Sequence, residues 1–136
     1  MLVVRENGAR AGDTLYLAGE IGAPRPEGER ADDLLRGIRQ VFVPAAVADT
    51  GGGVLAAAGE IADHAGLGFR IIKEALPVAA GTAVNADTAP AGYLFCSPRR
   101  PVATMTLTID GVRVTPVGEL TAAGRTVEEA DTAAGD

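Results

Sequence analysis

The sequence predicts an α+β domain, with a mixed β-sheet and helices packed on one of its faces. Apolar residues recur at helical spacing between residues 31 and 42, and a period-two pattern runs from residue 103 to 109. The chain has 136 residues, enough for one domain with a single modest core. The elements expected along the chain follow the order β-β-α-α-β-α-β-β, which is typical of an α+β arrangement.

The first two strands are expected at Leu2–Val4 and Leu15–Gly19, which are short apolar runs. Asn7 and Gly8 lie between them, and this pair tolerates the positive φ angles of a tight turn. The pattern therefore predicts a hairpin between the two runs. Prolines and glycines between residues 22 and 28 then interrupt the sheet.

Two helices are expected next, over 31–42 and 54–65. The first carries Asp32 and Asp33 near its positive end, and Gly66 is placed to end the second. Pro44 and the glycine run at 51–53 separate them. The apolar residues that share a helical face are Leu34, Leu35, Ile38, Val41 and Phe42 in the first, and Val54, Leu55, Ala58, Ile61, Ala62 and Ala65 in the second.

The second half of the chain predicts further strands. Gly68–Leu76 indicates one strand, and a short helix is expected around residues 84–85. Ala103–Ile109 alternates apolar residues with threonine, as in a half-buried strand. Asp110–Gly111 predicts a turn into a partner strand, in which Pro116 indicates a sheet edge or a bulge.

The domain is expected to span residues 1–120, with an acidic, disordered tail over 121–136. The net charge is −6, from 12 basic and 18 acidic residues, and this balance argues against nucleic acid as a partner. One cysteine cannot form an internal disulfide, which favours a reducing compartment. With no leader-like or membrane-spanning run, we expect a cytoplasmic protein that does not contact membranes.

Composition also bears on assembly and on cofactors. Aromatic residues make up only 4% of the chain, so the core is expected to consist of small aliphatic side chains. Such a core buries little area per residue, which favours association with further copies. The single histidine, His64, has no cysteine cluster near it and is expected to be exposed on a helix. We therefore expect no metal and no cofactor.

Several short segments resemble the Rid (YjgF-like, reactive intermediate deaminase) family over roughly residues 2–120. Gly12–Ile21, reading GDTLYLAGEI, resembles the family strand that usually ends Ser-Gly-Gln-Ile. The other similar segments are Gly28-Glu29 with Arg39-Gln40, Leu55–Gly59, Val84-Asn85, and Arg100-Pro101 with the threonine-rich strand. The resemblance implies the Rid/YjgF and chorismate-mutase-like fold and a homotrimer that binds small molecules in clefts between subunits.

The residues that deaminating Rid proteins use are largely replaced in this chain. The arginine that holds the substrate carboxylate falls on Ala103, and the family's last-strand glutamate falls on Thr115. Met105 takes the place of the carbonyl contributor, and Asn85 alone keeps the identity expected in the pocket. The resemblance therefore implies a pocket without the usual imine deaminase activity. Ala103, Thr115 and Asn85 are its expected substrate-binding positions.

Glu20 and Arg100 are the candidate catalytic residues. Glu20 replaces the family's common glutamine and can act as an acid or base if burial raises its pKa. A structural surface glutamate is the alternative. Arg100, or Arg99 beside it, can stabilise developing negative charge on a substrate. Solvated arginines, or an ion pair between subunits, are the alternative.

Cys96 and the glycine run are weaker candidates. The two arginines can supply the positive field that a reactive Cys96 needs, whereas a buried, inert thiol is the alternative. Residues 51–53 can form an anion nest, but no strand is expected before them and no P-loop lysine follows. A flexible loop is the alternative for this run.

The function expected from these features is a small-molecule enzyme of isomerase, cyclase or hydrolase type. Glu20 and Arg100 would be its catalytic residues, with Asn85, Arg99, Cys96, Ala103 and Thr115 around the substrate. Two alternatives stay open, a trimer that binds a metabolite without turnover and a residual enamine or imine deaminase. The sequence does not identify the substrate.

Overall fold

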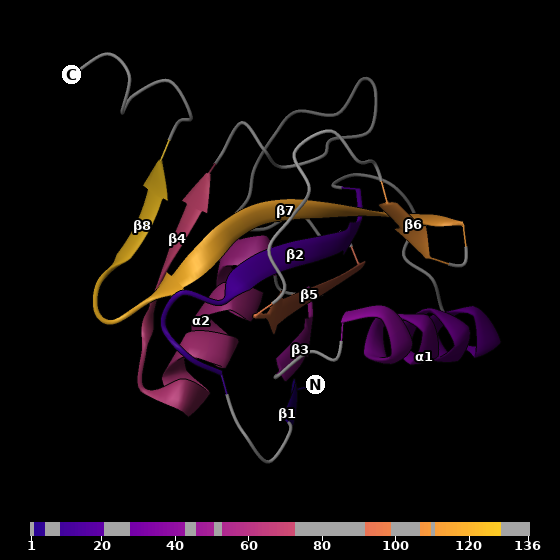
Figure 1. Ribbon diagram of the computed structural model, residues 1–136, viewed down its shortest axis with the longest axis horizontal. Coiled ribbons are helices and arrows are strands. Elements are labelled where there is room, and N and C mark those ends of the chain that lie inside the picture. Colours follow the sequence, from indigo (N-terminus) through magenta and orange to yellow (C-terminus); the bar gives the residue numbers. More distant parts are fainter. Residues whose placement is uncertain are drawn as a thin grey trace.

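A computed structural model describes residues 2–4, 9–20, 28–42, 46–50, 53–72, 92–98, 107–109 and 111–128. Strands dominate this part of the chain, and two helices, α1 and α2, flank them (Figure 1). The elements in chain order are β1 (Leu2–Val4), β2 (Thr14–Gly19), α1 (Glu29–Phe42), β3 (Ala46–Asp49), α2 (Val54–Ala65), β4 (Gly68–Ile72), β5 (Gly92–Ser97), β6 (Leu107–Ile109), β7 (Val112–Thr121) and β8 (Arg125–Glu128).

The strands form one sheet with the order β1-β3-β5-β2-β7-β4-β8, and β6 pairs with β7 beside this path. Every pairing is antiparallel except that between β4 and β8. The register of β2 against β7 shifts between Leu15 and Tyr16, which pair with Gly118 and Pro116. The bulge expected at Pro116 is therefore confirmed, in a strand that lies inside the sheet.

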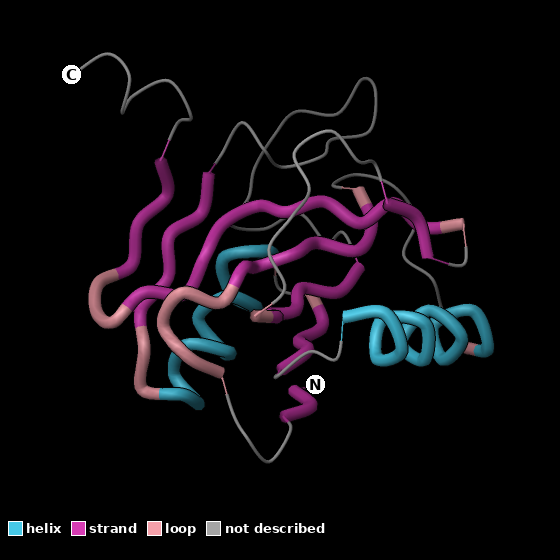
Figure 2. Tube along the Cα trace, viewed as in Figure 1, coloured by secondary structure: helices cyan, strands magenta, loops and turns pink. Residues whose placement is uncertain are grey.

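The two helices cover opposite faces of the sheet. In β2, Leu15 and Leu17 pack in one core with Ile61 of α2. The alternate residues Tyr16 and Ala18 pack in a second core with residues of α1. Figure 2 shows α1 and α2 well apart on either side of the strands. The expectation of helices on a single face is wrong, because successive residues of a strand point to opposite faces and both sets are apolar in β2.

Aromatic residues concentrate in the core beneath α1. The rings of Tyr16 and Phe42 lie 4.6 Å apart, and those of Phe42 and Phe95 lie 4.9 Å apart. Tyr16 and Phe95 stack at 5.4 Å. This cluster joins the last residue of α1 to β2 and β5. The core beneath α2 consists of aliphatic residues together with Phe69 and Cys96.

The N-terminal hairpin expected from Asn7 and Gly8 is wrong. Strand β1 pairs with β3, whereas β2 pairs with β5 and β7. Local turn chemistry made a hairpin plausible, but β2 is apolar on both faces. Such a strand is stabilised most by pairing on both sides inside the sheet.

Three strands were absent from the sequence prediction, namely β3, β5 and β8. Strand β5 contains Tyr93-Leu94-Phe95-Cys96, a continuous apolar run of the kind that a fully buried strand shows. Strand β8 extends the sheet beyond the boundary that we expected at residue 120 and reaches Glu128. No helix among the described residues is long and apolar enough to cross a membrane.

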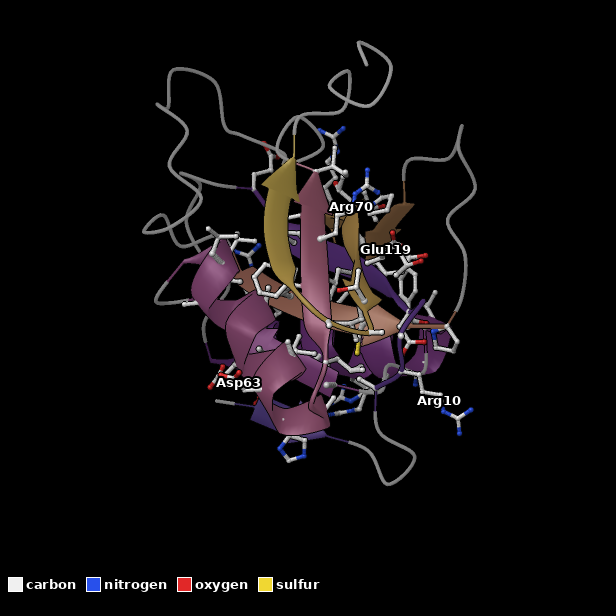
Figure 3. The ribbon with its side chains drawn as sticks, turned by 90° about the vertical axis from the view of Figure 1, so that its left-hand side faces the viewer. Arg10, Asp63, Arg70 and Glu119 are labelled. Carbon is white, nitrogen blue, oxygen red and sulfur yellow. The ribbon has the colours of Figure 1, made fainter. Side chains whose placement is uncertain are left out.

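The charged pair Arg70–Glu119 joins β4 to β7 on the face of the sheet opposite α2. Their side chains are 3.6 Å apart and partly exposed (Figure 3). Neighbouring residues Phe69 and Ile71 point the other way, into the core beneath α2. An exposed pair of this kind contributes little to stability, so it marks a solvated part of the sheet.

Candidate functional site

Several strands end or begin at one end of the sheet, which we call the edge, and the chain enters α2 from there. Strands β2 and β3 end there, and β5 begins there, because Gly19 and Asp49 pair with Gly92 and Tyr93. Strand β7 also begins near this edge, since its Val114 pairs with Ala18. From Asp49 the chain leads directly into α2. The ends of strands are common sites for binding residues, since a rigid scaffold positions them.

The beginning of α2 is the positive end of its helix dipole. Gly53 is its N-cap residue, with φ 103°, and no side chain of the described residues caps the helix. The first turn of α2 contains no acidic residue, whereas the first turn of α1 contains Glu29 and Asp32. Free backbone N–H groups and the positive end of the dipole favour anions, above all phosphate groups.

The segment before the glycine run at 51–53 differs from the expectation. No strand was expected there, and this is wrong because β3 ends at Asp49. Residues 50–53, three of which are glycine, connect the end of β3 to the start of α2. The segment Ala46-Val47-Ala48 gave too short an apolar pattern to predict the strand, although all three side chains are buried.

Of the predicted site residues, Glu20 lies at this edge. It is partly exposed and directly follows Gly19, the last residue of β2. Arg113 in β7 is exposed and lies one residue before Val114, near the same edge. An acidic and a basic residue therefore lie near the adjoining ends of β2 and β7 at this edge.

Thr115 lies farther into the sheet. It pairs with Leu17, so its side chain shares the face of the sheet that α2 covers. The Thr115 Oγ1 atom is buried and has no hydrogen-bond partner within the part of the chain that the structure describes. A buried hydroxyl group without a partner is uncommon in folded proteins and calls for an explanation.

Cys96 lies at the other end of β5, where it pairs with Leu15. Its side chain is fully buried in the core beneath α2. The structure does not bring Cys96 together with Glu20, because Cys96 pairs with Leu15, which is five positions before Glu20, or roughly 17 Å along a strand. Asn85, Arg99, Arg100 and Ala103 lie outside the described residues, so their predicted roles stay predictions.

Asp13 and Ser97 are buried polar residues with defined hydrogen bonds. The Asp13 carboxylate accepts a hydrogen bond of 3.1 Å from the Arg10 backbone N–H and so stabilises the turn before β2. The Ser97 hydroxyl donates a hydrogen bond of 2.9 Å to the carbonyl oxygen of Phe42. Both lie at the end of the sheet opposite Gly92. Within the described residues, no group of three or more His, Cys, Asp or Glu residues is placed to hold a metal ion.

Solved structures that resemble this fold are thiamine-monophosphate kinases. The enzyme from Stenotrophomonas maltophilia K279a is 16% identical in sequence, with a TM-score of 0.58, and the match covers 93% of this chain and 54% of that one. The Aquifex aeolicus enzyme is 20% identical, with a TM-score of 0.60, over 88% of this chain and 51% of that one. A structure described as AaThiL complexed with AMPPCP and TMP gives 20% identity and a TM-score of 0.62, over 88% of this chain and 48% of that one.

The fold is similar to about half of a thiamine-monophosphate kinase. This finding overturns the resemblance to the Rid family. No protein-family model matches the chain, and no curated protein matches it in sequence. Within the segment Gly12–Ile21, which resembles a Rid-family strand, residues Thr14–Gly19 form β2, and a motif this short can arise in either fold.

The functions inferred from that resemblance are corrected with it. An isomerase, cyclase or hydrolase is not supported, because the structural neighbours are kinases. The comparisons give no support to a metabolite-binding trimer or to a residual imine deaminase either. The homotrimer was implied only by the Rid resemblance, so that prediction has no remaining support.

Proposed function

We propose that this chain is a phosphate-binding domain of a kinase-type protein. It would bind the phosphate groups of a nucleotide or of a phosphorylated small molecule. The observation that carries the proposal is the similarity of fold to thiamine-monophosphate kinases, which extends over 88–93% of this chain. One of these structures is complexed with AMPPCP and TMP, and both ligands are phosphate compounds.

The beginning of α2 is the part of the described chain best suited to this task. Its N-terminal backbone N–H groups have no side-chain cap, and no acidic residue lies in the first turn. Phosphate groups bind well at such helix ends, because several N–H groups point toward them along the dipole. Glu20 follows β2, and Arg113 and Thr115 lie on β7, whose first residues are near the same edge, so these three are proposed as candidates for contacts with the rest of the ligand.

Catalysis is proposed to need more protein than this chain. The chain spans about half the length of the thiamine-monophosphate kinase structures that it matches. The proposal therefore concerns binding by this domain, and the second half of the reaction machinery would come from a further domain or a second chain. Binding of the phosphate compound by this chain alone is the property to be tested.

Ala56 offers a sharp test, because it is exposed in the first turn of α2. Ala56→Glu places a negative charge near the proposed phosphate site, and Ala56→Lys places a positive one there. A charge near a helix end is worth about 0.3–1 kcal/mol, so the affinity for phosphate ligands should change by roughly twofold to fivefold. Glutamate should weaken binding, lysine should strengthen it, and the neutral control Ala56→Gln should leave it near the wild-type value.

The stability of the same variants should change in the opposite direction. Glutamate in the first turn stabilises the helix dipole and lysine opposes it, so Ala56→Glu should unfold at a higher temperature than Ala56→Lys. Isothermal titration calorimetry with thiamine monophosphate, thiamine and AMPPCP measures the affinities. Equal affinity of all variants, or no preference of the wild-type chain for thiamine monophosphate over thiamine, contradicts the proposal.

Self-association of the chain is a separate proposal that follows from composition. The core contains few aromatic residues, so burying additional surface between copies is favourable. Native mass spectrometry tests it directly, since masses above 13.8 kDa in multiples of one chain indicate association. A monomer at all concentrations would contradict it without affecting the proposal on phosphate binding.

A further inference from the structure

Thr50 is the last residue before the glycine-containing loop, and its side chain is fully buried. Its hydroxyl group donates a hydrogen bond of 2.9 Å to the Gly92 carbonyl oxygen. The same hydroxyl accepts a hydrogen bond of 2.7 Å from the Gly92 backbone N–H. The Thr50 backbone N–H adds a third bond, of 3.0 Å, to the Gly92 carbonyl oxygen. Thr50 thus joins the end of β3 to the beginning of β5, because its hydroxyl group both donates a hydrogen bond to Gly92 and accepts one from it.

The partner of Thr50 cannot shift easily. Gly92 pairs with Gly19 at the end of β2, and a Cβ atom at Gly92 would collide with the Ala18 carbonyl oxygen. The backbones of β2 and β5 therefore approach each other closely at this point. A residue that is bonded to Gly92 is held relative to both strands.

Thr50 is also connected to the start of α2. The Gly53 N–H donates a hydrogen bond of 2.9 Å to the Thr50 carbonyl oxygen, and the Ala57 N–H donates one of 3.2 Å to the Gly53 carbonyl oxygen. The bonds therefore run in sequence from β5 through Thr50 and Gly53 into the first turn of α2.

We infer that Thr50 is a positioning residue, whose hydroxyl group fixes the N-terminal end of α2 against the edge formed by β2 and β5. The consequence for ligand binding rests on the proposed function, because the phosphate groups would bind at that helix end. Preorganised N–H groups bind an anion more tightly than groups that must first be ordered. The positioning itself does not depend on any ligand.

Thr50→Val tests the inference, since valine has nearly the same shape but no hydroxyl group. Thr50→Ser retains the hydroxyl and should behave like the wild type. Ser97→Ala is the matched control. Ser97 is fully buried, as Thr50 is, but it is the last residue of β5, at the end opposite Gly92, and its hydroxyl group donates a hydrogen bond to the Phe42 carbonyl oxygen. Both Thr50→Val and Ser97→Ala therefore remove one buried hydroxyl group.

Hydrogen exchange of the ligand-free protein measures the positioning. In Thr50→Val the N–H groups of Gly53 and Ala57 should exchange up to about tenfold faster, as expected for the loss of one buried hydrogen bond. The Leu67 N–H, which bonds to the Ala62 carbonyl oxygen near the end of α2, should exchange as in the wild type. Ser97→Ala should leave the exchange of Gly53 and Ala57 unchanged.

Calorimetry with thiamine monophosphate and AMPPCP then separates the two proposals. Weaker binding by Thr50→Val, with near-wild-type binding by Thr50→Ser and Ser97→Ala, supports both. Faster local exchange in Thr50→Val without ligand binding by the wild type contradicts the proposed function and supports the positioning role. The positioning role is overturned if Thr50→Val accelerates exchange of the Leu67 N–H as much as that of Gly53 and Ala57. It is also overturned if Thr50→Val and Ser97→Ala change the exchange of these groups in the same way.

Discussion

The hydroxyl group of Thr115 illustrates how a single atom can weaken a well-packed sheet. Its Oγ1 atom is buried without a hydrogen-bond partner in the described ranges of the chain. Thr115→Val replaces it with a methyl group of similar size and should raise the free energy of unfolding by about 1 kcal/mol, because a buried unsatisfied polar group is costly. Urea denaturation followed by circular dichroism measures this change.

Thr121 on the same strand provides the control for that substitution. Its hydroxyl group is exposed and donates a hydrogen bond of 3.1 Å to the Ala123 carbonyl oxygen. Thr121→Val therefore loses a bond that exists and should be neutral or slightly destabilising. If Thr115→Val is the more destabilising of the two, the Thr115 hydroxyl has a partner that stabilises it.

At the level of residues, the sequence indicated some of the candidate site but not its geometry. Glu20 was singled out because it replaces the common glutamine of the Rid family, a resemblance that the fold overturns, and it directly follows β2 at the edge where β5 begins. Thr50 was not identified. Its burial depends on Gly92, which is 42 positions away in the sequence, and no local pattern reveals such a partner.

Among the elements, α2 shows most clearly how a sequence signal sets a boundary. The helix ends at Ala65, and Gly66 follows in the left-handed conformation, with φ 70°. Its N–H contacts the carbonyl oxygens of Ala62 and Asp63. This is the glycine-capped end that the sequence predicted.

Replacing Gly66 isolates the conformational part of this cap. A Cβ atom at this position would meet no other atom within 4 Å, so any cost comes from the backbone conformation. Gly66→Ala should lower the free energy of unfolding by roughly 1 kcal/mol. Gly66→Asn should cost less, because asparagine tolerates this conformation. Thermal unfolding of both variants measures the difference, and equal losses would contradict the explanation.

The helices were predictable and several strands were not, for a physical reason. Each helix is stabilised along a face whose apolar residues recur within a few positions, and the expected range 54–65 is confirmed in α2. Strand β3 has only four residues, and strand β8 is stabilised by β4, which lies far from it in sequence. Short strands carry little periodicity, so their existence depends on partners that a single sequence does not specify.

For the molecule as a whole, the C-terminal boundary is testable. Strand β8 pairs in parallel with β4, and the Phe69 N–H donates a hydrogen bond of 2.9 Å to the Gly124 carbonyl oxygen. Ending the chain after Gly124 removes β8 and should lower the free energy of unfolding by about 1–3 kcal/mol, since several backbone hydrogen bonds are lost. Ending it after Glu128 keeps β8 and is the control.

Urea denaturation of the two shortened chains measures this prediction. A chain that ends after Gly124 and is as stable as the chain that ends after Glu128 would show that β8 contributes nothing to the fold. The expected result would extend the domain past residue 120, where the acidic composition had suggested that a tail begins.

The resemblance to the Rid family failed at this scale because a fold is defined by the pairing of strands. The order β1-β3-β5-β2-β7-β4-β8 joins segments from both ends of the chain. Short motifs such as Gly12–Ile21 describe one strand and say nothing about its neighbours. Fold class was therefore predictable in outline as α+β, whereas the topology was not.

The position of β2 inside the sheet has a consequence for folding while the protein is synthesised on the ribosome. Its two neighbours are β5 and β7, and β7 ends at Thr121. Both edges of β2, a strand that is apolar on both faces, can therefore be covered only after the chain has been synthesised through β7, about a hundred residues later. Pairings this distant form slowly, and an uncovered apolar strand invites association with other chains. Until β7 has been synthesised, β2 is therefore a site at which the nascent chain can associate with other chains.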